Sequence, residues 1–597
     1  MDLTRAPEAD RLIEAGHPLE DAGDFEGALT LYRRAIVAAP DYARAHMNAG
    51  NALGKLERWE EALAAQRKAV ECAPDHAAAH FNLGSLLLAR GDLAAAEAEL
   101  LRASELRPDM AEAAVLLAEL YEKVERFDDA EAQFRRALAL APEHAGTLLN
   151  FGTFCMRQGR RDEAMALLMR AKQLEPTLGS LESVLVFSLN WATDLTAESI
   201  AERHRQVGAD IARSAGPRFT TWPNDREAER ALRVGYVSGD FRHHPVALFL
   251  RPILEQHDRR AIETFCYSNY AQDNDVAQVL RERSRHWRDV SALSDEQFIA
   301  ELRRDRIDIL VDLSGHTQRN RLSAFARHPA PVQVTWLGYL NTTGVPAIDY
   351  RICDRHTDPE GATEHLHTER LVRMPYSQWC YAPWLGMERV PVSQPQPRAS
   401  VVFGSFNQLA KVSDACLKLW CDVLARAPRS SLLVLDVRQP ETGRALLERI
   451  ERNGIDPARI SVRGRQAMID YFAAIGSVDI ALDTFPSNGA TTTLDTLWMG
   501  VPVVALRGER GISRGGYSIL KTLGADELIA CDPGQYVDLN VRLANDVQWR
   551  SRLRETLRPR LTASPLMDAK QFVDDLEARY RAMWRAWCSK SSGGSVT

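Results

Sequence analysis

The chain has 597 residues, of which 45% are apolar and 26% charged, and its formal net charge is −7. This composition excludes a largely disordered or fibrous protein, and the acidic balance does not favour nucleic-acid binding. No stretch reaches the ~18 apolar residues of a membrane span, the N-terminus lacks a signal-peptide core, and the cysteines form no C-x-x-C pair. We therefore expect a cytoplasmic protein with no nucleic-acid or membrane partner.

The N-terminal third carries a repeat with a period of 34 residues. Prolines recur at that spacing, at Pro40, Pro74, Pro108, Pro142 and Pro176. Columns of alanine or glycine that start at Ala28, Ala35 and Gly50 share the period, and so does a bulky column that starts at Phe25. Small residues where helices approach closely, and a proline after the second helix, are typical of stacked helix-turn-helix units. The pattern resembles tetratricopeptide repeats and predicts an α-helical superhelix over residues 1–190.

Asparagines recur at one position of three repeats: Asn48, Asn82 and Asn150. Side-chain amides aligned along a groove can hydrogen-bond the backbone of an extended peptide without reading its sequence. Alternatively, each asparagine satisfies only a neighbouring turn between repeats. The sequence thus predicts a groove for polypeptide but leaves this second interpretation open.

After a helical connector at residues 191–230, strands alternate with helices, which predicts mostly parallel sheets. We expect a first lobe over 231–390, with strands at 232–237, 264–267, 307–313 and 332–337. A proline-rich linker at 391–400 leads to a second lobe over 401–560, with strands at 401–406, 431–437, 459–462, 479–482 and 502–506. A C-terminal helix and tail follow at 561–597. In such doubly wound lobes, ligands bind beyond the carboxyl ends of the strands.

The segment after the strand at 479–482 is the first candidate ligand site. Asn488, Gly489, Thr491 and Thr492 lead into a helix expected at 493–499, and free N–H groups at a helix start bind phosphates. Asp495, one turn further on, can accept hydrogen bonds from a ribose. The same residues also fit an ordinary helix start capped by threonine.

In each lobe, one further candidate segment follows the first strand. In the second lobe, Gln408 and Lys411 can meet a diphosphate, although Lys411 can equally be a solvated surface charge. In the first lobe, only one of His243 and His244 can point into a site, as a base or a positioning group. The alternative is a loop or helix-capping histidine. His316, after another first-lobe strand, is a weaker candidate of the same kind.

No metal or cofactor is expected. The D-x-D at Asp273-Asn274-Asp275 lies in a polar loop, and neither H-E-x-x-H nor G-x-x-x-x-G-K-[ST] occurs. Hydride transfer is disfavoured because Gly235 and Gly239 lack the third glycine of a dinucleotide fingerprint.

Four ordered motifs carry a family resemblance: 232–241 (LRVGYVSGDF), 334–339 (VTWLGY), 404–408 (GSFNQ) with Lys411, and Asn488-Gly489 with Thr491, Thr492 and Asp495. Together with the repeats, they resemble the O-linked N-acetylglucosamine transferase family and its SPINDLY-like relatives over nearly the whole chain. The resemblance is to bacterial members, close to that of Xanthomonas. It implies a GT-B fold of two Rossmann-like, doubly wound lobes. It also implies an inverting, metal-independent transfer of N-acetylglucosamine from UDP-N-acetylglucosamine to serine or threonine hydroxyls of polypeptides.

The resemblance further implies roles for single residues. Lys411 and Gln408 would contact the diphosphate, Thr491 and Thr492 the phosphates, and Asp495 the ribose, while His244, not His243, would be the active-site histidine. Gln466 joins the expected substrate-binding residues.

Three positions depart from the animal enzymes: Ala490 replaces a histidine, Met468 replaces a ribose-contacting lysine, and Tyr471 replaces a histidine that stacks on uracil. A tyrosine can still stack on a base. SPINDLY-like members use GDP-fucose, so a protein O-fucosyltransferase is one alternative function, and an inactive scaffold is another.

Overall fold

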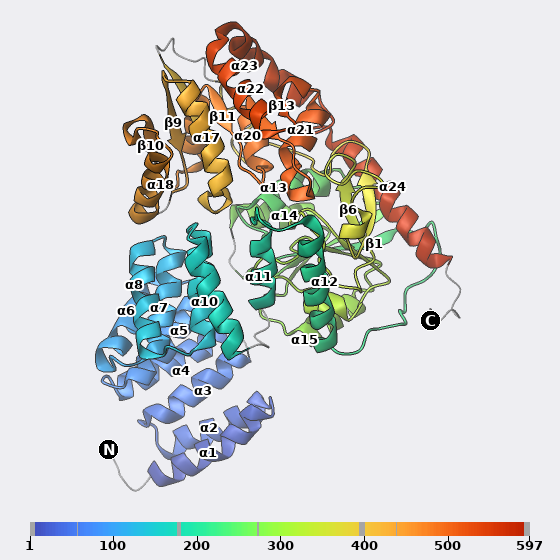
Figure 1. The fold of residues 1–597 in the computed structure, drawn as a ribbon. Coiled ribbons are helices and arrows are strands. Elements are labelled where there is room, and N and C mark those ends of the chain that lie inside the picture. The colour runs from blue at the N-terminus through green and yellow to red at the C-terminus, as the bar shows by residue number, and fades with distance from the viewer. Residues whose placement is uncertain are drawn as a thin grey trace. The chain divides into compact units, whose positions relative to one another are not determined.

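A computed structural model describes residues 6–56, 58–175, 181–271, 274–392, 400–437 and 439–589 (Figure 1). Pro176, Asp273, most of the predicted linker and the tail from residue 590 lie outside these ranges. The chain forms two compact units, one of residues 1–152 and 166–177 and the other of residues 153–165 and 178–597.

The repeats form consecutive helices, of which the first eight pack as four helix pairs. The helices are α1 (Ala6–Asp21), α2 (Phe25–Ala38), α3 (Ala43–Lys55), α4 (Trp59–Cys72), α5 (Ala77–Arg90), α6 (Leu93–Leu106), α7 (Ala111–Lys123), α8 (Phe127–Leu140), α9 (Ala145–Arg157) and α10 (Arg161–Leu174). Ala28, Ala62 and Ala96, in the first alanine column, are 0% exposed. A Cβ on Gly84 would lie 2.8 Å from Leu100, so only a very small residue lets the two helices of this pair meet. The tetratricopeptide-type prediction is confirmed.

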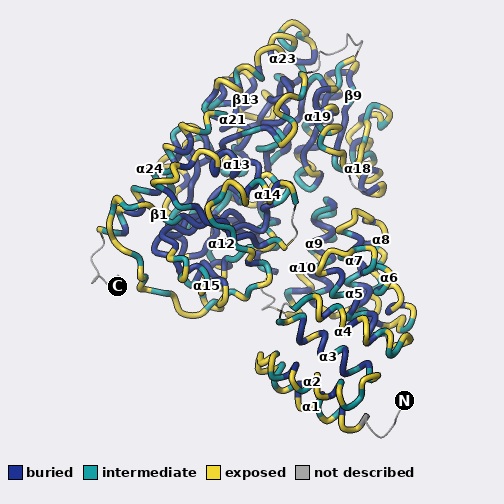
Figure 2. The backbone as a smooth tube through the Cα atoms, turned by 180° about the vertical axis from the view of Figure 1, so that it is seen from behind, coloured by how far each residue is buried: buried dark blue, intermediate teal, exposed yellow. Residues whose placement is uncertain are grey.

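The first lobe is built on a seven-stranded parallel sheet in the order β3-β2-β1-β4-β5-β6-β7. The strands are β1 (Leu232–Ser238), β2 (Ile262–Ser268), β3 (His286–Asp289), β4 (Ile309–Asp312), β5 (Val332–Thr335), β6 (Tyr350–Asp354) and β7 (Arg370–Met374). Helices α13 (Pro245–Gln256), α14 (Asp275–Arg283), α15 (Asp295–Arg304) and α16 (Leu322–Ala326) connect them. The strands at the centre of this sheet are buried (Figure 2).

The second lobe has a six-stranded parallel sheet in the order β10-β9-β8-β11-β12-β13. Its strands are β8 (Val401–Ser405), β9 (Ser430–Val434), β10 (Ile460–Val462), β11 (Ile480–Leu482), β12 (Val503–Leu506) and β13 (Ile529–Ala530). Its helices are α17 (Asp414–Arg426), α18 (Pro440–Arg452), α19 (Met468–Ser477), α20 (Thr491–Trp498), α21 (Gly515–Leu523), α22 (Pro533–Asn545) and α23 (Val547–Thr562). The predicted pair of doubly wound lobes is confirmed.

The last helix, α24 (Ala569–Cys588), follows the second lobe in sequence but packs on the first (Figure 1). His257 Nδ1 lies 2.8 Å from Glu577 Oε1, and the Trp584 indole donates a 3.1 Å hydrogen bond to Glu227 O. The predicted C-terminal helix therefore fastens the end of the chain to the first lobe.

The helices α11 (Leu181–Leu189) and α12 (Ala197–Ser214) belong to the same unit as the two lobes, although we expected the repeat array to extend to residue 190. His204 on α12 lies 2.6 Å from the Tyr339 hydroxyl of the first lobe. A side chain on Gly208 would collide with Gly344 O, so α12 packs directly on first-lobe backbone. In the described ranges, no helix is both long enough and apolar enough to cross a membrane.

Candidate active site

The strand order places the predicted site residues. In each sheet the direction of connection reverses once, between β1 and β4 in the first lobe and between β8 and β11 in the second. Ligands of open parallel sheets bind at such a reversal, beyond the carboxyl ends of the strands. In the second lobe, the loops at this point are 406–411 and 483–490; in the first lobe, they are 239–244 and 313–321.

Lys411 joins the two loops of the second lobe. It ends the short 3₁₀ helix Leu409–Lys411, and its Nζ donates a 3.1 Å hydrogen bond to Asn488 O. Burial lowers the pKa of Lys411, and the nearby Asp483 carboxylate opposes this effect. Lys411 is therefore a half-buried cation at the sheet reversal and not a solvated surface charge.

Asp483 and Asn407 hold this region in place, and the sequence analysis assigned a role to neither of them. Asp483 Oδ1 accepts hydrogen bonds from the amides of Thr484 and Gly489, both at 2.8 Å. Asn407 Nδ2 donates to the same oxygen at 3.3 Å, and its Oδ1 accepts from Thr492 Oγ1 at 2.9 Å. Burial raises the pKa of Asp483 to about 6. The signal that could have revealed Asp483 is its place directly after a buried strand.

The start of α20 is not capped by a side chain. The helix begins at Thr491, and Ala490 occupies the N-cap position, where it supplies no acceptor. The hydroxyl of Thr492 is engaged with Asn407, and that of Thr493 donates to Gly489 O at 2.9 Å. A threonine cap, the alternative interpretation of this segment, is therefore absent, and the first N–H groups of α20 keep their capacity to bind an anion.

Asp495 lies where the sequence places it, but its surroundings differ from the expected ribose contact. The residue is 1% exposed. Tyr381 OH donates to Oδ1 at 2.8 Å, while Tyr471 OH and Trp384 Nε1 donate to Oδ2 at 3.2 and 3.3 Å. Burial raises the pKa of Asp495 to about 7. A buried carboxyl group needs such partners, and here the protein itself provides them.

Tyr471 therefore turns its hydroxyl to Asp495. Its ring meets Phe406 edge to face, with 6.3 Å between the ring centroids. Gln408 and Gln466 are exposed, and Gln466 Nε2 donates to Gly464 O at 3.1 Å. Stacking of Tyr471 on a base, contact of Gln408 with a diphosphate and substrate binding by Gln466 stay predictions.

His244 and its neighbour His243 point to different partners. His244 caps α13, since its Nδ1 accepts from Val246 N at 3.3 Å, and the same atom lies 3.7 Å from Asp240 Oδ2. Burial lowers the pKa of His244, and Asp240 opposes that change. His243 is exposed and lies 2.6 Å from Asp275 Oδ1. Of the two, His244 is the half-buried one, paired with a carboxylate that follows β1.

His316 is buried inside the first lobe, and both of its ring nitrogens have protein partners. Its Nδ1 lies 3.0 Å from Ser183 Oγ, and its Nε2 lies 2.8 Å from Thr343 O. Burial lowers the pKa of His316 to about 3. Nδ1 thus links the first lobe to α11, Nε2 contacts another loop of the same lobe, and substrate binding by His316 stays a prediction.

Comparison with known proteins identifies the family. The sequence pattern of glycosyl transferase family 41 matches residues 182–381 and 392–576. The chain belongs to glycosyl transferase family 41. Tetratricopeptide repeat patterns match residues 13–77, 50–111 and 123–178 of this family 41 protein.

Two curated relatives and one solved structure illustrate the similarity. The "Probable UDP-N-acetylglucosamine--peptide N-acetylglucosaminyltransferase SPINDLY" of Solanum lycopersicum is 38% identical over 68% of this chain and 44% of its own length. The protein named SEC in Arabidopsis thaliana is 32% identical over 60% of this chain and 38% of its own length. The chain thus spans less than half of these relatives. A mutant of Thermobaculum terrenum O-GlcNAc transferase is 36% identical, with a TM-score of 0.81 over 86% of this chain and 98% of that chain. The expected closeness to a Xanthomonas member stays a prediction.

The predicted asparagine column in the repeats is only partly available to a ligand. Asn48 Nδ2 donates to Arg44 O at 3.0 Å, and Asn150 Nδ2 donates to Glu119 Oε1 at 2.9 Å. Asn82 makes no hydrogen bond with another described residue. Contacts within the repeats thus account for two of the three amides, and the peptide groove stays a prediction.

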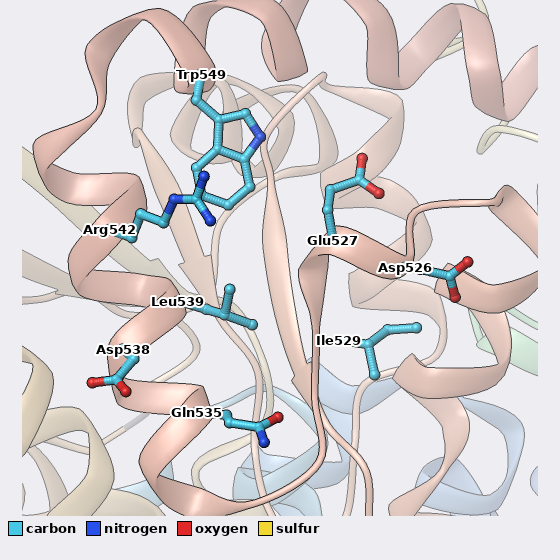
Figure 3. A pocket seen from close by; sticks show the side chains of 8 residues that line it. All are labelled: Asp526, Glu527, Ile529, Gln535, Asp538, Leu539, Arg542 and Trp549. Carbon is cyan, nitrogen blue, oxygen red and sulfur yellow. The ribbon is translucent and has the colours of Figure 1, made fainter.

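A separate hollow of about 420 Å³ lies in the second lobe (Figure 3). Its lining residues are Asp526, Glu527, Ile529, Gln535, Asp538, Leu539, Arg542 and Trp549. The Arg542 guanidinium lies over the Trp549 ring, 4.7 Å from its centroid. None of the predicted site residues lines this hollow. Within the described ranges, no group of three or more His, Cys, Asp or Glu is placed to hold a metal.

Proposed function

We propose that this protein is a protein O-glycosyltransferase that transfers N-acetylglucosamine from UDP-N-acetylglucosamine to serine and threonine hydroxyls, with inversion and without a metal. The observation that carries the proposal is the pairing of Lys411 with Asn488 beside the uncapped start of α20. A cation and free amide N–H groups at one sheet reversal suit a leaving nucleoside diphosphate. The family and the similarity to an O-GlcNAc transferase structure support the same activity.

In the proposed reaction, the acceptor oxygen attacks the anomeric carbon from the face opposite the diphosphate. The bond from that carbon to the diphosphate oxygen breaks, and its electron pair leaves with the nucleotide. Negative charge therefore develops on the diphosphate, where Lys411 and the N–H groups of α20 stabilise it. Because these groups stabilise the developing negative charge, we expect no requirement for a divalent cation.

The acceptor proton needs a destination, and His244, in the loop after β1, is the candidate of the first lobe. Its lowered pKa keeps the imidazole neutral near pH 7, so it can accept a proton. Asp240 Oδ2, 3.7 Å from Nδ1, would stabilise the imidazolium that forms. Because the attacked carbon is already electron-poor, proton removal comes late, and the proton passes to water or to a phosphate oxygen of the donor. His244 then acts mainly by positioning the acceptor hydroxyl.

We also propose that the repeats bind the polypeptide acceptor, as the peptide acceptors in the names of the relatives suggest. Replacing Asn48, Asn82 and Asn150 by alanine should then raise the KM of protein acceptors more than that of short peptides. An equal effect on both classes would contradict the groove.

Nine free cysteines fit a reducing compartment, so we place the protein in the cytoplasm.

The donor is tested directly with a panel that includes UDP-N-acetylglucosamine and GDP-fucose, the donor that the SPINDLY-like resemblance implies. The full chain is incubated with each donor and a protein acceptor, and intact-mass spectrometry distinguishes an added N-acetylhexosamine from a deoxyhexose. Product from UDP-N-acetylglucosamine alone supports the proposal, and product from GDP-fucose alone replaces its donor. Nucleotide binding without product from any donor would indicate an inactive scaffold.

A further inference from the structure

Two arginines of the first lobe share one aromatic ring beside His244. Arg242 follows β1, Tyr270 follows β2 and Arg319 follows β4, and these three strands are neighbours in the sheet. The Arg319 guanidinium lies 4.9 Å from the Tyr270 ring centroid, and that of Arg242 lies 5.6 Å from it. The pair therefore stands at the carboxyl ends of the strands, at the sheet reversal of the first lobe.

The charge around this ring is not balanced. Arg242 donates a 2.8 Å hydrogen bond to Asp240 Oδ1, which offsets its charge. The guanidinium of Arg319 forms no ion pair with another described residue, and Arg319 is exposed. Desolvation and the nearby charges of Arg242 and Arg157 lower the pKa of Arg319. One positive charge thus remains on Arg319, at a place where other cations already crowd it.

The backbone fixes Arg319 in a conformation that favours glycine. Its φ is 56°, and a Cβ on Gly239 would lie 2.6 Å from Arg319 Cβ, so the loops after β1 and β4 are in close contact. Asn269 Nδ2 donates a 2.8 Å hydrogen bond to Arg319 O. A left-handed conformation costs about 1 kcal/mol for a residue other than glycine. Strain of this kind is concentrated at functional positions.

We propose that Arg319, together with Arg242, binds a side-chain carboxylate of the acceptor polypeptide, close to the hydroxyl that is glycosylated. The proposal rests on the proposed function and adds a preference for acidic acceptor segments. Asp240 connects the two sites, because its Oδ1 holds Arg242 and its Oδ2 lies 3.7 Å from His244 Nδ1. A single unbalanced positive charge matches a carboxylate better than a doubly charged phosphate, and a guanidinium can bind both carboxylate oxygens.

The test uses peptides that share one serine and differ only by glutamate or glutamine at a single flanking position, scanned along the peptide. Both kcat/KM for transfer and the equilibrium Kd of the labelled peptide are measured. At one or more positions, wild type should prefer glutamate about fivefold at low salt, the upper range for an exposed ion pair. The preference should fade in 0.5 M salt, at roughly a 4 Å screening length.

Four variants complete the design. Arg319→Ala and Arg319→Gly should both lose the preference for glutamate. Because Arg319→Gly also relieves the positive φ, it should fold at least as well as wild type. Arg319→Lys should retain part of the preference. Arg259→Ala, which removes an exposed arginine just before β2 at the other end of that strand, should keep it.

Measuring both kcat/KM for transfer and the Kd of the peptide distinguishes failure of the carboxylate site from failure of the proposed function. Transfer without a glutamate preference at any position, or equal preferences in Arg319→Gly and Arg259→Ala, would overturn the carboxylate site and leave the proposed function intact. A glutamate preference in binding that Arg319→Gly abolishes, with no transfer from any donor, would support the site and overturn the proposed function.

Discussion

Replacing Lys411 by methionine should lower kcat about 10²–10³-fold at saturating donor. The substitution keeps the length of the side chain and removes only its charge and hydrogen-bond donors. Lys411 is half-buried at the reversal between β8 and β11, and its Nζ contacts Asn488 O at 3.1 Å. For a full unit of charge 4 Å from Nζ, Coulomb's law at an effective dielectric constant of 20 gives about 4 kcal/mol. Only part of that charge develops in the transition state, so the expected loss of kcat is about 10²–10³-fold.

The fold should tolerate this change. Loss of the hydrogen bond to Asn488 O is worth about 1 kcal/mol of unfolding free energy, which a thermal melt can follow. The matched control is Lys418→Met on α17, where the lysine is exposed and pairs with Asp422 at 3.1 Å. That control should keep wild-type kcat and almost wild-type stability, because an exposed ion pair contributes at most about 1 kcal/mol.

The assay compares turnover with UDP affinity, measured by calorimetry. Lys411→Met should lose more turnover than His244→Ala, because the lysine acts on charge that appears only in the transition state. Near-normal turnover of a folded Lys411→Met enzyme would refute the assignment. If His244→Ala were far slower than Lys411→Met, with UDP binding unchanged, His244 would be the general base and not a positioning group.

Three other predictions concern nucleotide binding, pH and metal. Tyr471→Phe keeps the ring and removes one of the two donors to Asp495 Oδ2, the other being Trp384 Nε1. UDP should then bind at least as tightly as to wild type, and a tenfold loss in calorimetry would contradict competition between this hydroxyl and the nucleotide for Asp495. Buried His316 has a pKa of about 3, whereas an unfolded histidine titrates near 6.5, so acid favours the unfolded chain. The stability of wild type relative to His316→Gln, from urea melts, should therefore fall by about 2 kcal/mol between pH 6.5 and 5, and a constant difference would refute a neutral buried His316. EDTA should leave transfer unchanged, and activity that returns only with magnesium or manganese would refute metal independence.

The fold could be predicted where the pattern that defines it is local. The 34-residue period and the central strands depend on residues close in sequence, and the structure has them. The strands β3, β6, β7 and β13 were not predicted. Both β3, with the sequence His-Trp-Arg-Asp, and β7 lie at edges of the sheet and are only partly buried. In β6, Arg351 is buried although an arginine reads as exposed in the sequence, and its Nη1 donates to Tyr339 O at 2.9 Å in the loop after β5.

The difference between local patterns and contacts between distant residues also explains which features of the candidate site could be predicted. The positions of Lys411 and His244 beyond the strand ends could be predicted because each follows a recognisable strand, and position after a strand is a local property. The role of His316 depends on Ser183, which is 133 residues away, and no pattern near His316 reports on that contact. The partners Tyr381 and Trp384 of Asp495 are likewise more than 100 residues away.

Asp495 shows why a residue can be located correctly and still have an additional role. Tyr381 and Trp384 belong to the segment between β7 and β8, which connects the two lobes, and Tyr381 N also donates to Leu566 O just before α24. At the end of α20, the Trp498 indole donates to Met387 O in the same segment. One helix of eight residues thus offers its free N–H groups at one end and holds the inter-lobe segment along its length. The Asp495 carboxylate therefore links the first turns of α20 in the second lobe to the connection between the lobes.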